Sequence, residues 1–301
     1  LESRQDFETA YGKCCVVDDA NYYCVSKHQS KTNAEQYLRF CDEAGLKYRE
    51  EMPPQGVVDK SLIELSLRTE EGVYDFVELK KLVLDRLSRA RSIDLRLGHK
   101  VIDGTIETGG GKTLRIESSD SCFSKTFDYV VNAMYANHNR FCDWFGFDKR
   151  LFQFNLQELC VIELPVSSPI GITIQDGPFP SFLPLGFSPN RCLFAHVEAS
   201  QLIRNVSQSN ERLLSQIMYL ESNWSGILEV SLPFLPILSD AKYLRSIFVD
   251  RVVDATQSST DARLTELTSH GAGCWSMFAA KIITCESMSK KIAAEIQGAK
   301  S

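Results

Sequence analysis

The sequence TDARLTELTSHGAGCWSMFAAKIITC, residues 260–285, combines three features. Arg263 lies in a polar turn, residues 271–273 read Gly-Ala-Gly, and Lys281 follows an apolar run. Glycines let a ligand approach the backbone closely, the first N–H groups of a helix bind anions, and a lysine among apolar residues needs a partner. The stretch therefore predicts one wall of a site for a large, planar, charged cofactor. The alternative is a glycine-containing turn before a last strand and a last helix.

The composition is that of a soluble globular protein, with 44% hydrophobic and 24% charged residues among 301. This length allows one large domain or two modest ones. A formal net charge of −6 argues against nucleic acid as a partner. The cysteines have no paired spacing and the histidines are scattered, which predicts reduced thiols and no metal site. Because no signal peptide or membrane-spanning run is recognisable, we expect a cytoplasmic protein with a small-molecule partner.

Hydrophobic patterning predicts short strands and amphipathic helices before residue 130. Strands are expected at residues 22–25, 62–67, 94–97, 100–107, 113–117 and 122–127. Helices are expected after Asn33 and after Asp75, whose side chains can accept hydrogen bonds from a first helical turn. The linker TGGGKT at residues 108–113 resembles the end of a phosphate-binding loop. However, Ile106 stands where that loop needs glycine, and a strand-like alternation follows, so a hairpin turn is predicted.

Residues 128–133 form a continuous apolar strand that ends in the polar Asn132 and the small Ala133. Buried parallel strands end in this way at a ligand crevice, although a buried strand with a solvent-facing end has the same pattern. Residues 151–164 alternate, which predicts a long strand with one buried and one polar face. Together with residues 191–197 they indicate a mostly antiparallel sheet.

His196 lies in the last of these strands and is a candidate general base. A lone histidine on a strand is more often a structural residue, so both interpretations are kept. An amphipathic helix is predicted at residues 210–224, a strand at 243–253 and a closing helix at 286–297.

Four places in this order of elements have short motifs. They are GVYD at residues 72–75, GHKV at 98–101 with DYVVNA at 128–133, GITIQDG at 171–177 with LP at 183–184, and TDAR, HGAGCW and KIIT at 260–263, 270–275 and 281–284. Their order and spacing resemble the FAD-dependent oxidoreductases of the D-amino-acid oxidase superfamily. This superfamily includes glycine oxidase-like and glycerol-3-phosphate dehydrogenase-like enzymes.

The resemblance implies an α+β fold, with a mostly antiparallel substrate-domain sheet and an incomplete Rossmann-like FAD-binding domain. It implies an entry segment of the substrate domain at residues 1–70 and part of the FAD-binding domain at 71–140. The substrate domain would follow at 141–255, and the closing segment of the FAD-binding domain at 256–301.

The resemblance also implies FAD as cofactor and hydride transfer to the flavin from a small anionic amine or alcohol. Arg263 is the candidate for holding the anionic group of the substrate, and His196 is a weaker catalytic candidate. Lys281 could stabilise negative charge on the reduced flavin. The candidate cofactor-binding residues are Val101, Asn132, Ala133, Gly271, Ala272, Gly273, Trp275, Lys281 and Thr284.

The sequence departs from the superfamily in the part that binds the flavin pyrophosphate. No Gly-x-Gly-x-x-Gly loop occurs in it, and residues 1–30 resemble sequence that would follow such a loop. FAD binding is therefore expected to need an upstream segment. Leu264 stands where many members have proline, and alanines precede Lys281 where glycines are common. The alternative function is a non-catalytic binding or scaffold protein that keeps the substrate sheet and lacks the cofactor-binding unit.

Overall fold

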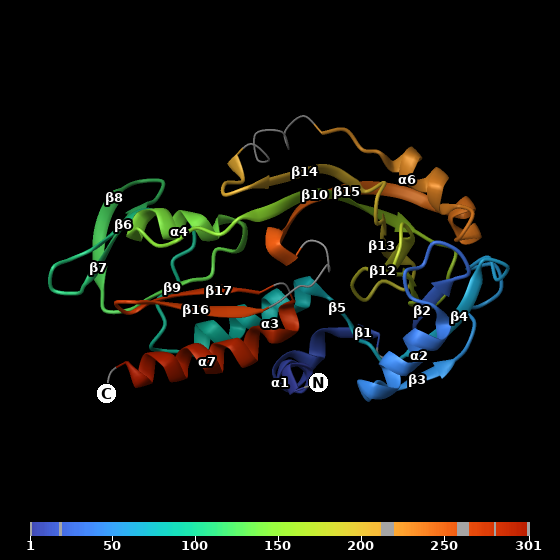
Figure 1. Ribbon diagram of the computed structural model, residues 1–301, viewed down its shortest axis with the longest axis horizontal. Coiled ribbons are helices and arrows are strands. Elements are labelled where there is room, and N and C mark those ends of the chain that lie inside the picture. The colour runs from blue at the N-terminus through green and yellow to red at the C-terminus, as the bar shows by residue number, and fades with distance from the viewer. Residues whose placement is uncertain (1, 18–19, 212–219, 258–264, 280, 300–301) are drawn as a thin grey trace.

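A computed structural model describes residues 2–17, 20–211, 220–257, 265–279 and 281–299. The molecule is elongated and has two halves (Figure 1). The large-sheet half is built on a nine-stranded sheet, and the small-sheet half contains two three-stranded sheets. The long strands β10 (Phe152–Glu163) and β15 (Lys242–Asp254) belong to the large sheet and reach across to the small-sheet half.

The nine-stranded sheet is antiparallel except for the parallel pair of β11 with β2. Its main path runs β14 (Gln201–Ser207), β10, β13 (Arg191–His196), β12 (Pro180–Pro184), β11 (Gly171–Gln175), β2 (Asn21–Ser26), β4 (Ile63–Thr69) and β3 (Tyr48–Glu50). On its other edge, β10 pairs with β15 over its whole length. The mostly antiparallel sheet predicted from the sequence is confirmed.

Alternate residues of β10 contribute to two hydrophobic cores. The sheet core lies in the large-sheet half and is covered by α6 (Trp224–Ser231), with Phe182, Phe194 and Ile227 fully buried in it. The joint core contains residues of both halves, namely Ala136, Phe152, Phe154, Leu156, Val252 and Phe278. The other face of β10 has the predicted polar residues near its start, but Gln153 and Asn155 are buried, and the buried Val161 lies on the same face.

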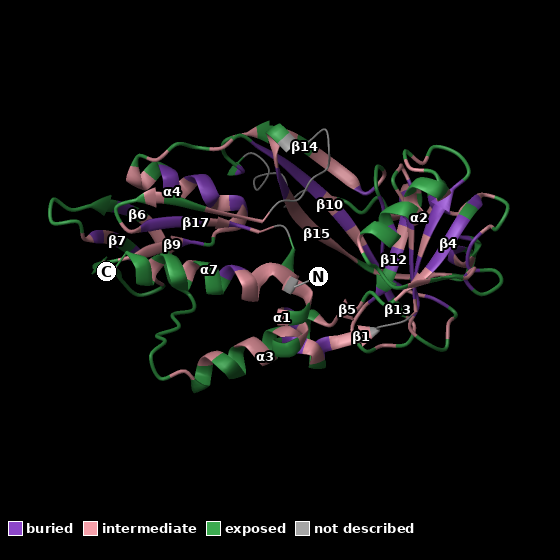
Figure 2. Ribbon diagram, turned by 60° about the horizontal axis from the view of Figure 1, so that its bottom comes forward, coloured by how far each residue is buried: buried purple, intermediate pink, exposed green. Residues whose placement is uncertain are grey.

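Side-chain caps start the two helices predicted in the first third of the chain. Asn33 forms a capping box at the start of α2 (Ala34–Glu43), which packs on β2 and β4. Asp75 accepts hydrogen bonds from the N–H groups of the first turn of α3 (Phe76–Arg89). No residue of α3 is fully buried, and Phe76 is 63% exposed, but Leu79 and Val83 of the predicted apolar face are half-buried against the cluster of Phe7, Tyr11 and Cys14 (Figure 2).

The small-sheet half contains two separate sheets. One has the order β16 (Glu266–Gly271), β17 (Cys274–Phe278), β9 (Val130–Asn132), and the other is the meander β6 (Lys100–Ile106), β7 (Lys112–Glu117), β8 (Cys122–Phe127). The linker TGGGKT is the turn between β6 and β7, as predicted. The helices of this half are α1 (Glu2–Tyr11), α3, α4 (His138–Phe145) and α7 (Cys285–Gly298), and a two-stranded ribbon pairs β1 (Cys15–Val17) with β5 (Val73–Tyr74).

Two of the predicted elements differ from the structure. The strand expected at residues 94–97 is wrong, because this segment pairs with no strand in the described part of the chain and Leu97 is 74% exposed. A strand pattern forms a strand only where a neighbouring edge can accept its hydrogen bonds. The helix predicted at residues 210–224 lies largely outside the described residues, and α6 begins where that prediction ends.

Candidate cofactor site

The carboxyl ends of β9 and β17 lie side by side, because the two strands are parallel and Ser276 is opposite Asn132. In open α/β sheets, ligands bind in the crevice outside the carboxyl ends of the strands. The chain leaves β9 at Ala133, which is exposed, and leaves β17 at Phe278. We call this end of the small sheet the carboxyl edge. Of the cofactor-binding residues predicted from the sequence, it contains Asn132 and Ala133.

The side chain of Asn132 is buried and fully engaged within the protein. Its amide nitrogen donates to the carbonyl of His138 and to the hydroxyl of Ser276, both at 3.1 Å, and its amide oxygen accepts from the N–H of Met134 at 3.0 Å. These bonds fix the backbone that follows β9 to β17. Any contact of Asn132 with a ligand would therefore come from its backbone.

Tyr135 is a residue of the carboxyl edge that the sequence did not indicate. It begins the short helix η2 (Tyr135–Asn137) with a φ of 48°, which is rare for a residue with a large side chain. Strained backbone of this kind clusters at functional sites. The ring of Tyr135 stacks on Phe278 with centroids 5.7 Å apart, and its hydroxyl accepts from the N–H of Val252 at 3.0 Å.

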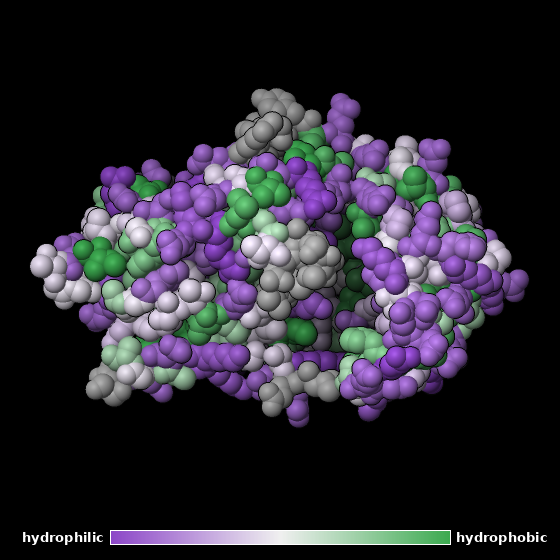
Figure 3. All heavy atoms as spheres, in the orientation of Figure 1, coloured by the Kyte–Doolittle hydropathy of each residue, from purple (hydrophilic) through white to green (hydrophobic). Residues whose placement is uncertain are grey.

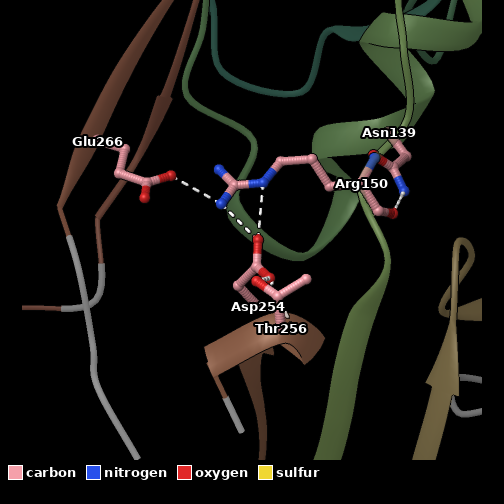
Figure 4. A network of polar contacts seen from close by, with 5 residues as sticks. All are labelled: Asn139, Arg150, Asp254, Thr256 and Glu266. Carbon is pink, nitrogen blue, oxygen red and sulfur yellow. Dashed lines mark hydrogen bonds and ion pairs between the residues drawn. The ribbon is translucent and has the colours of Figure 1, made fainter. Parts of the chain in front are cut away.

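Arg150 forms a polar joint between the two halves (Figure 4). Its guanidinium donates to one oxygen of Asp254 from Nε at 3.0 Å and from Nη2 at 2.5 Å, and Nη2 lies 2.7 Å from a carboxylate oxygen of Glu266. It also lies over the rings of Phe152 and Phe278, 5.6 and 5.5 Å from their centroids. Burial raises the pKa of Asp254, but hydrogen bonds from Thr256 and the charge of Arg150 outweigh this, and its pKa stays below the usual range.

Two histidines near this joint stay neutral at physiological pH. Burial lowers the pKa of His138 to about 4, with smaller contributions from the charges of Arg150 and His270. Its ring meets Phe152 and Phe278 edge-on, and its Nδ1 has no hydrogen-bond partner among the described residues. Burial also lowers the pKa of His270, whose Nε2 lies 2.8 Å from the hydroxyl of Ser276.

Residues 271–273 form the tight turn between β16 and β17, so they lie at the amino end of β17. Their φ angles are 76°, 49° and 73° for Gly271, Ala272 and Gly273. A side chain at Gly273 would come within 2.9 Å of the carbonyl oxygen of Asp128. A five-residue strand is roughly 16 Å long, so the structure separates this turn from the carboxyl edge. This arrangement is the glycine-containing turn before a last strand and helix, which the sequence left as the alternative.

The other predicted cofactor residues lie in different surroundings. Trp275 is buried, its ring contacts Tyr129, and its Nε1 donates to Glu295 at 3.4 Å. Lys281 is exposed, which contradicts the expectation that it is buried, because the chain has left the apolar strand β17 by this point. Thr284 donates to the carbonyl of Lys281 at 2.7 Å in the turn η5 (Ile282–Thr284), which leads into α7. Val101 is half-buried in β6.

Of the two predicted catalytic residues, the structure describes only His196. His196 is buried in the large-sheet half, where its Nδ1 accepts from the N–H groups of Glu198 and Ala199, both at 3.2 Å. Burial lowers its pKa, so it is neutral and holds a turn. Arg263 lies outside the described residues.

The surface is deeply hollowed between the two halves, and hydrophobic residues line part of the hollow (Figure 3). Within the described ranges, no group of three or more His, Cys, Asp or Glu side chains is placed to hold a metal ion. No helix in these ranges has the length and apolar character needed to cross a membrane.

The fold is similar to several solved oxidase and dehydrogenase structures. Glycine oxidase from Geobacillus kaustophilus matches with a TM-score of 0.70 and 14% identity, over 98% of this chain and 77% of that chain. L-proline dehydrogenase from P. horikoshii matches with a TM-score of 0.62 and 12% identity, over 100% and 77%. L-alpha-glycerophosphate oxidase from Mycoplasma pneumoniae, whose structure has FAD bound, matches with a TM-score of 0.69 and 10% identity, over 98% and 78%.

These matches confirm the α+β fold that the resemblance to the D-amino-acid oxidase superfamily implied. At this level of identity they establish the fold and no more. No protein-family model matches the chain, and no curated protein matches it in sequence.

Proposed function

We propose that this protein is an FAD-dependent oxidoreductase, or a part of one, that transfers a hydride from a small anionic amine or alcohol to the flavin. The observation that carries the proposal is the carboxyl edge of β9 and β17, which the joint core connects to the large antiparallel sheet. The similar solved structures include one with FAD bound. FAD, when bound, supplies the hydride acceptor.

The residues at the carboxyl edge fit part of an FAD site. The bonds of Asn132 fix the backbone around the exposed Ala133, and the buried Nδ1 of His138 lacks a partner among the described residues. Within the described chain only β17 pairs with β9, so the other edge of β9 has backbone groups for a further strand. The upstream Gly-x-Gly-x-x-Gly strand that we expect would pair there and bind the pyrophosphate.

The chain's own residues would then orient the substrate and stabilise charge. Lys281 is exposed and lies two residues after Ala279, which follows β17. It would stabilise negative charge on the reduced flavin ring. Arg263 would bind the carboxylate or phosphate of the substrate by a bidentate contact. His196 is held in a turn of the large-sheet half, so we assign it no step.

The longest natural form of the protein, purified and titrated with FAD, tests the proposal. We expect flavin absorbance bands in the purified protein, or saturable binding of added FAD. If no flavin bands are present and added FAD does not bind, the enzyme proposal fails and the non-catalytic binding protein becomes the better interpretation.

The role of Arg263 is tested separately once an anionic substrate has been found by a screen. Arg263→Ala should raise KM at least about tenfold, because a hydrogen bond to a charged group contributes about 1.5–3 kcal/mol. Arg191→Ala is the matched control, since Arg191 forms an exposed ion pair with Glu163 at 3.4 Å. An unchanged KM for Arg263→Ala would remove this residue from the site.

A further inference from the structure

Arg150 is fixed to the small-sheet half through its backbone. Its N–H donates to the amide oxygen of Asn139 at 3.0 Å, and its carbonyl accepts from the amide nitrogen of Asn139 at 2.7 Å. Asn139 is 5% exposed and lies in α4, which follows β9 after the short helix η2. These two bonds therefore fix the backbone of Arg150, from which its side chain extends, relative to the carboxyl edge.

The guanidinium of Arg150 then contacts residues of both sheets. Asp254 is the last residue of β15 in the large sheet, and Glu266 is the first residue of β16 in the small sheet. Glu266 is the cross-strand neighbour of Phe278, whose ring the same guanidinium covers. The guanidinium of Arg150 thus links the end of β15 to the start of β16, beside the carboxyl end of β17.

No other residue type reproduces this set of contacts. The planar guanidinium donates to two carboxylates in its plane while its face covers aromatic rings, whereas a lysine is a point charge that cannot do both. The side chains of Arg150 and Asp254 are only 23% and 15% exposed, so solvent screens this pair less than a surface pair. Without the cation, the carboxylates of Asp254 and Glu266 would face each other with no compensating charge.

We propose that Arg150 is a positioning residue for the carboxyl edge: it sets how Phe278 and the exit of β17 stand against β10 and β15. The identity of the ligand as FAD rests on the proposed function, but the contacts of Arg150 at the joint do not. Because Phe278 also stacks on Tyr135, displacement of its ring would disturb both strand ends at which we place the flavin.

The test uses the longest natural form of the protein with three variants: Arg150→Gln, the triple variant Arg150→Gln/Asp254→Asn/Glu266→Gln, and Lys149→Gln as control. Lys149 is the preceding residue and forms a single ion pair with Asp143 at 2.8 Å. Unfolding by urea reports stability, and quenching of FAD fluorescence reports affinity. The visible circular dichroism of FAD at saturation reports how the bound ring is oriented.

We expect Arg150→Gln to lower stability and to weaken FAD binding about tenfold, with an altered circular dichroism of the bound flavin. The triple variant removes the unpaired carboxylates, so it should regain stability while FAD binding stays weak. A purely structural role predicts that stability and affinity recover together. Recovery of both, or an Arg150→Gln variant with unchanged FAD affinity, overturns the proposal.

A wild-type protein that binds no FAD would refute the proposed function without deciding the role of the joint. Hydrogen exchange then decides it. Arg150→Gln should speed amide exchange in residues 266–278 and leave residues 63–69 of the large sheet unchanged, whereas Lys149→Gln should leave both unchanged. Equal exchange in wild type and Arg150→Gln at residues 266–278 overturns the proposal.

Discussion

The sheet core and the joint core are built on the same strand, β10, but from different kinds of residue. Cys160 and Ile162 of β10 contribute to the sheet core, where apolar side chains from six other strands and α6 meet. Phe152 and Phe154 contribute to the smaller joint core, which is surrounded by Arg150 and the neutral His138. The first core is almost purely apolar, and the second combines aromatic rings with charges.

Glu158 lies between these two cores on β10 and shows how the large-sheet half stabilises a buried carboxylate. It is fully buried and accepts hydrogen bonds from the hydroxyls of Ser222 and Ser246 and from the N–H of Asn223, just before α6. All of these donors are neutral and belong to the large-sheet half. The charges of the joint, by contrast, connect elements of different halves, so we expect the sheet core to govern stability and the joint core to govern the geometry of the site.

The largest expected effect is in the sheet core. Phe194→Ala should lower the free energy of unfolding by about 4 kcal/mol, because it removes a fully buried ring and leaves a cavity. Urea denaturation measures this loss. Phe187→Ala, at a side chain that is 57% exposed, is the control and should change stability by less than about 0.5 kcal/mol. A loss below about 1 kcal/mol for Phe194→Ala would contradict the role given to the sheet core.

The next effect is expected at Glu158. Glu158→Ala removes the shared acceptor of Ser222, Asn223 and Ser246 at a fully buried side chain and should cost about 3 kcal/mol in urea unfolding. Glu158→Gln keeps one acceptor oxygen and should cost less. Glu163→Ala, at the end of the same strand and in partly exposed ion pairs with Arg191 and Lys242, should cost at most about 1 kcal/mol. Equal losses of stability for Glu158→Ala and Glu163→Ala would show that the buried carboxylate of Glu158 contributes no more to stability than a partly exposed ion pair.

The joint core should respond to acid through His138. Its pKa is about 4 in the folded protein and 6.5 in the unfolded chain, so the unfolded state binds more protons between these values. The stabilisation is complete above pH 6.5 and is lost as the pH falls toward 4. We expect this loss of stability to reach about 2 kcal/mol.

His138→Leu isolates this contribution, because the lowered pKa values of His196 and His270 act in the same direction and remain in the variant. Wild type should lose about 2 kcal/mol more than His138→Leu between pH 6.5 and 4 when unfolding is measured at each pH. His28→Gln, at an exposed histidine, should keep the wild-type slope. Parallel stability curves for wild type and His138→Leu would contradict burial of a neutral His138.

Local patterns in the sequence predicted elements of both halves well. The alternation over β10, the caps Asn33 and Asp75 and the turn before β7 depend on nearest neighbours along the chain, and the structure has each of them. The strand expected at residues 94–97 shows the limit of this reasoning. Its pattern is that of a strand, but the pairing depends on an edge that no local pattern specifies.

The carboxyl edge was predicted only in part, because its contacts join residues far apart in the sequence. The strand ending in Asn132 was recognised, but the bond of Asn132 to Ser276 and the pairing of β9 with β17 are long-range. The joint of Arg150 with Asp254 and Glu266 gives no local signal either, since each residue alone resembles a surface charge. The positive φ of Tyr135 is also hidden, because glycine or asparagine is the usual signal for that conformation.

The smallest expected effect is at Lys281, and it would sharpen the contrast between stability and function. Lys281→Met removes an exposed charge, so unfolding should change by less than about 0.5 kcal/mol. If Lys281 stabilises the reduced flavin, the variant should lower the two-electron reduction potential of bound FAD by about 30 mV, which is a tenfold change in the equilibrium. Lys290→Met is the matched control, since Lys290 is exposed on α7 and pairs with Asp6 at 2.7 Å. Equal potentials in the two variants would place Lys281 away from the flavin, and the carboxyl edge would then be set by backbone and joint alone.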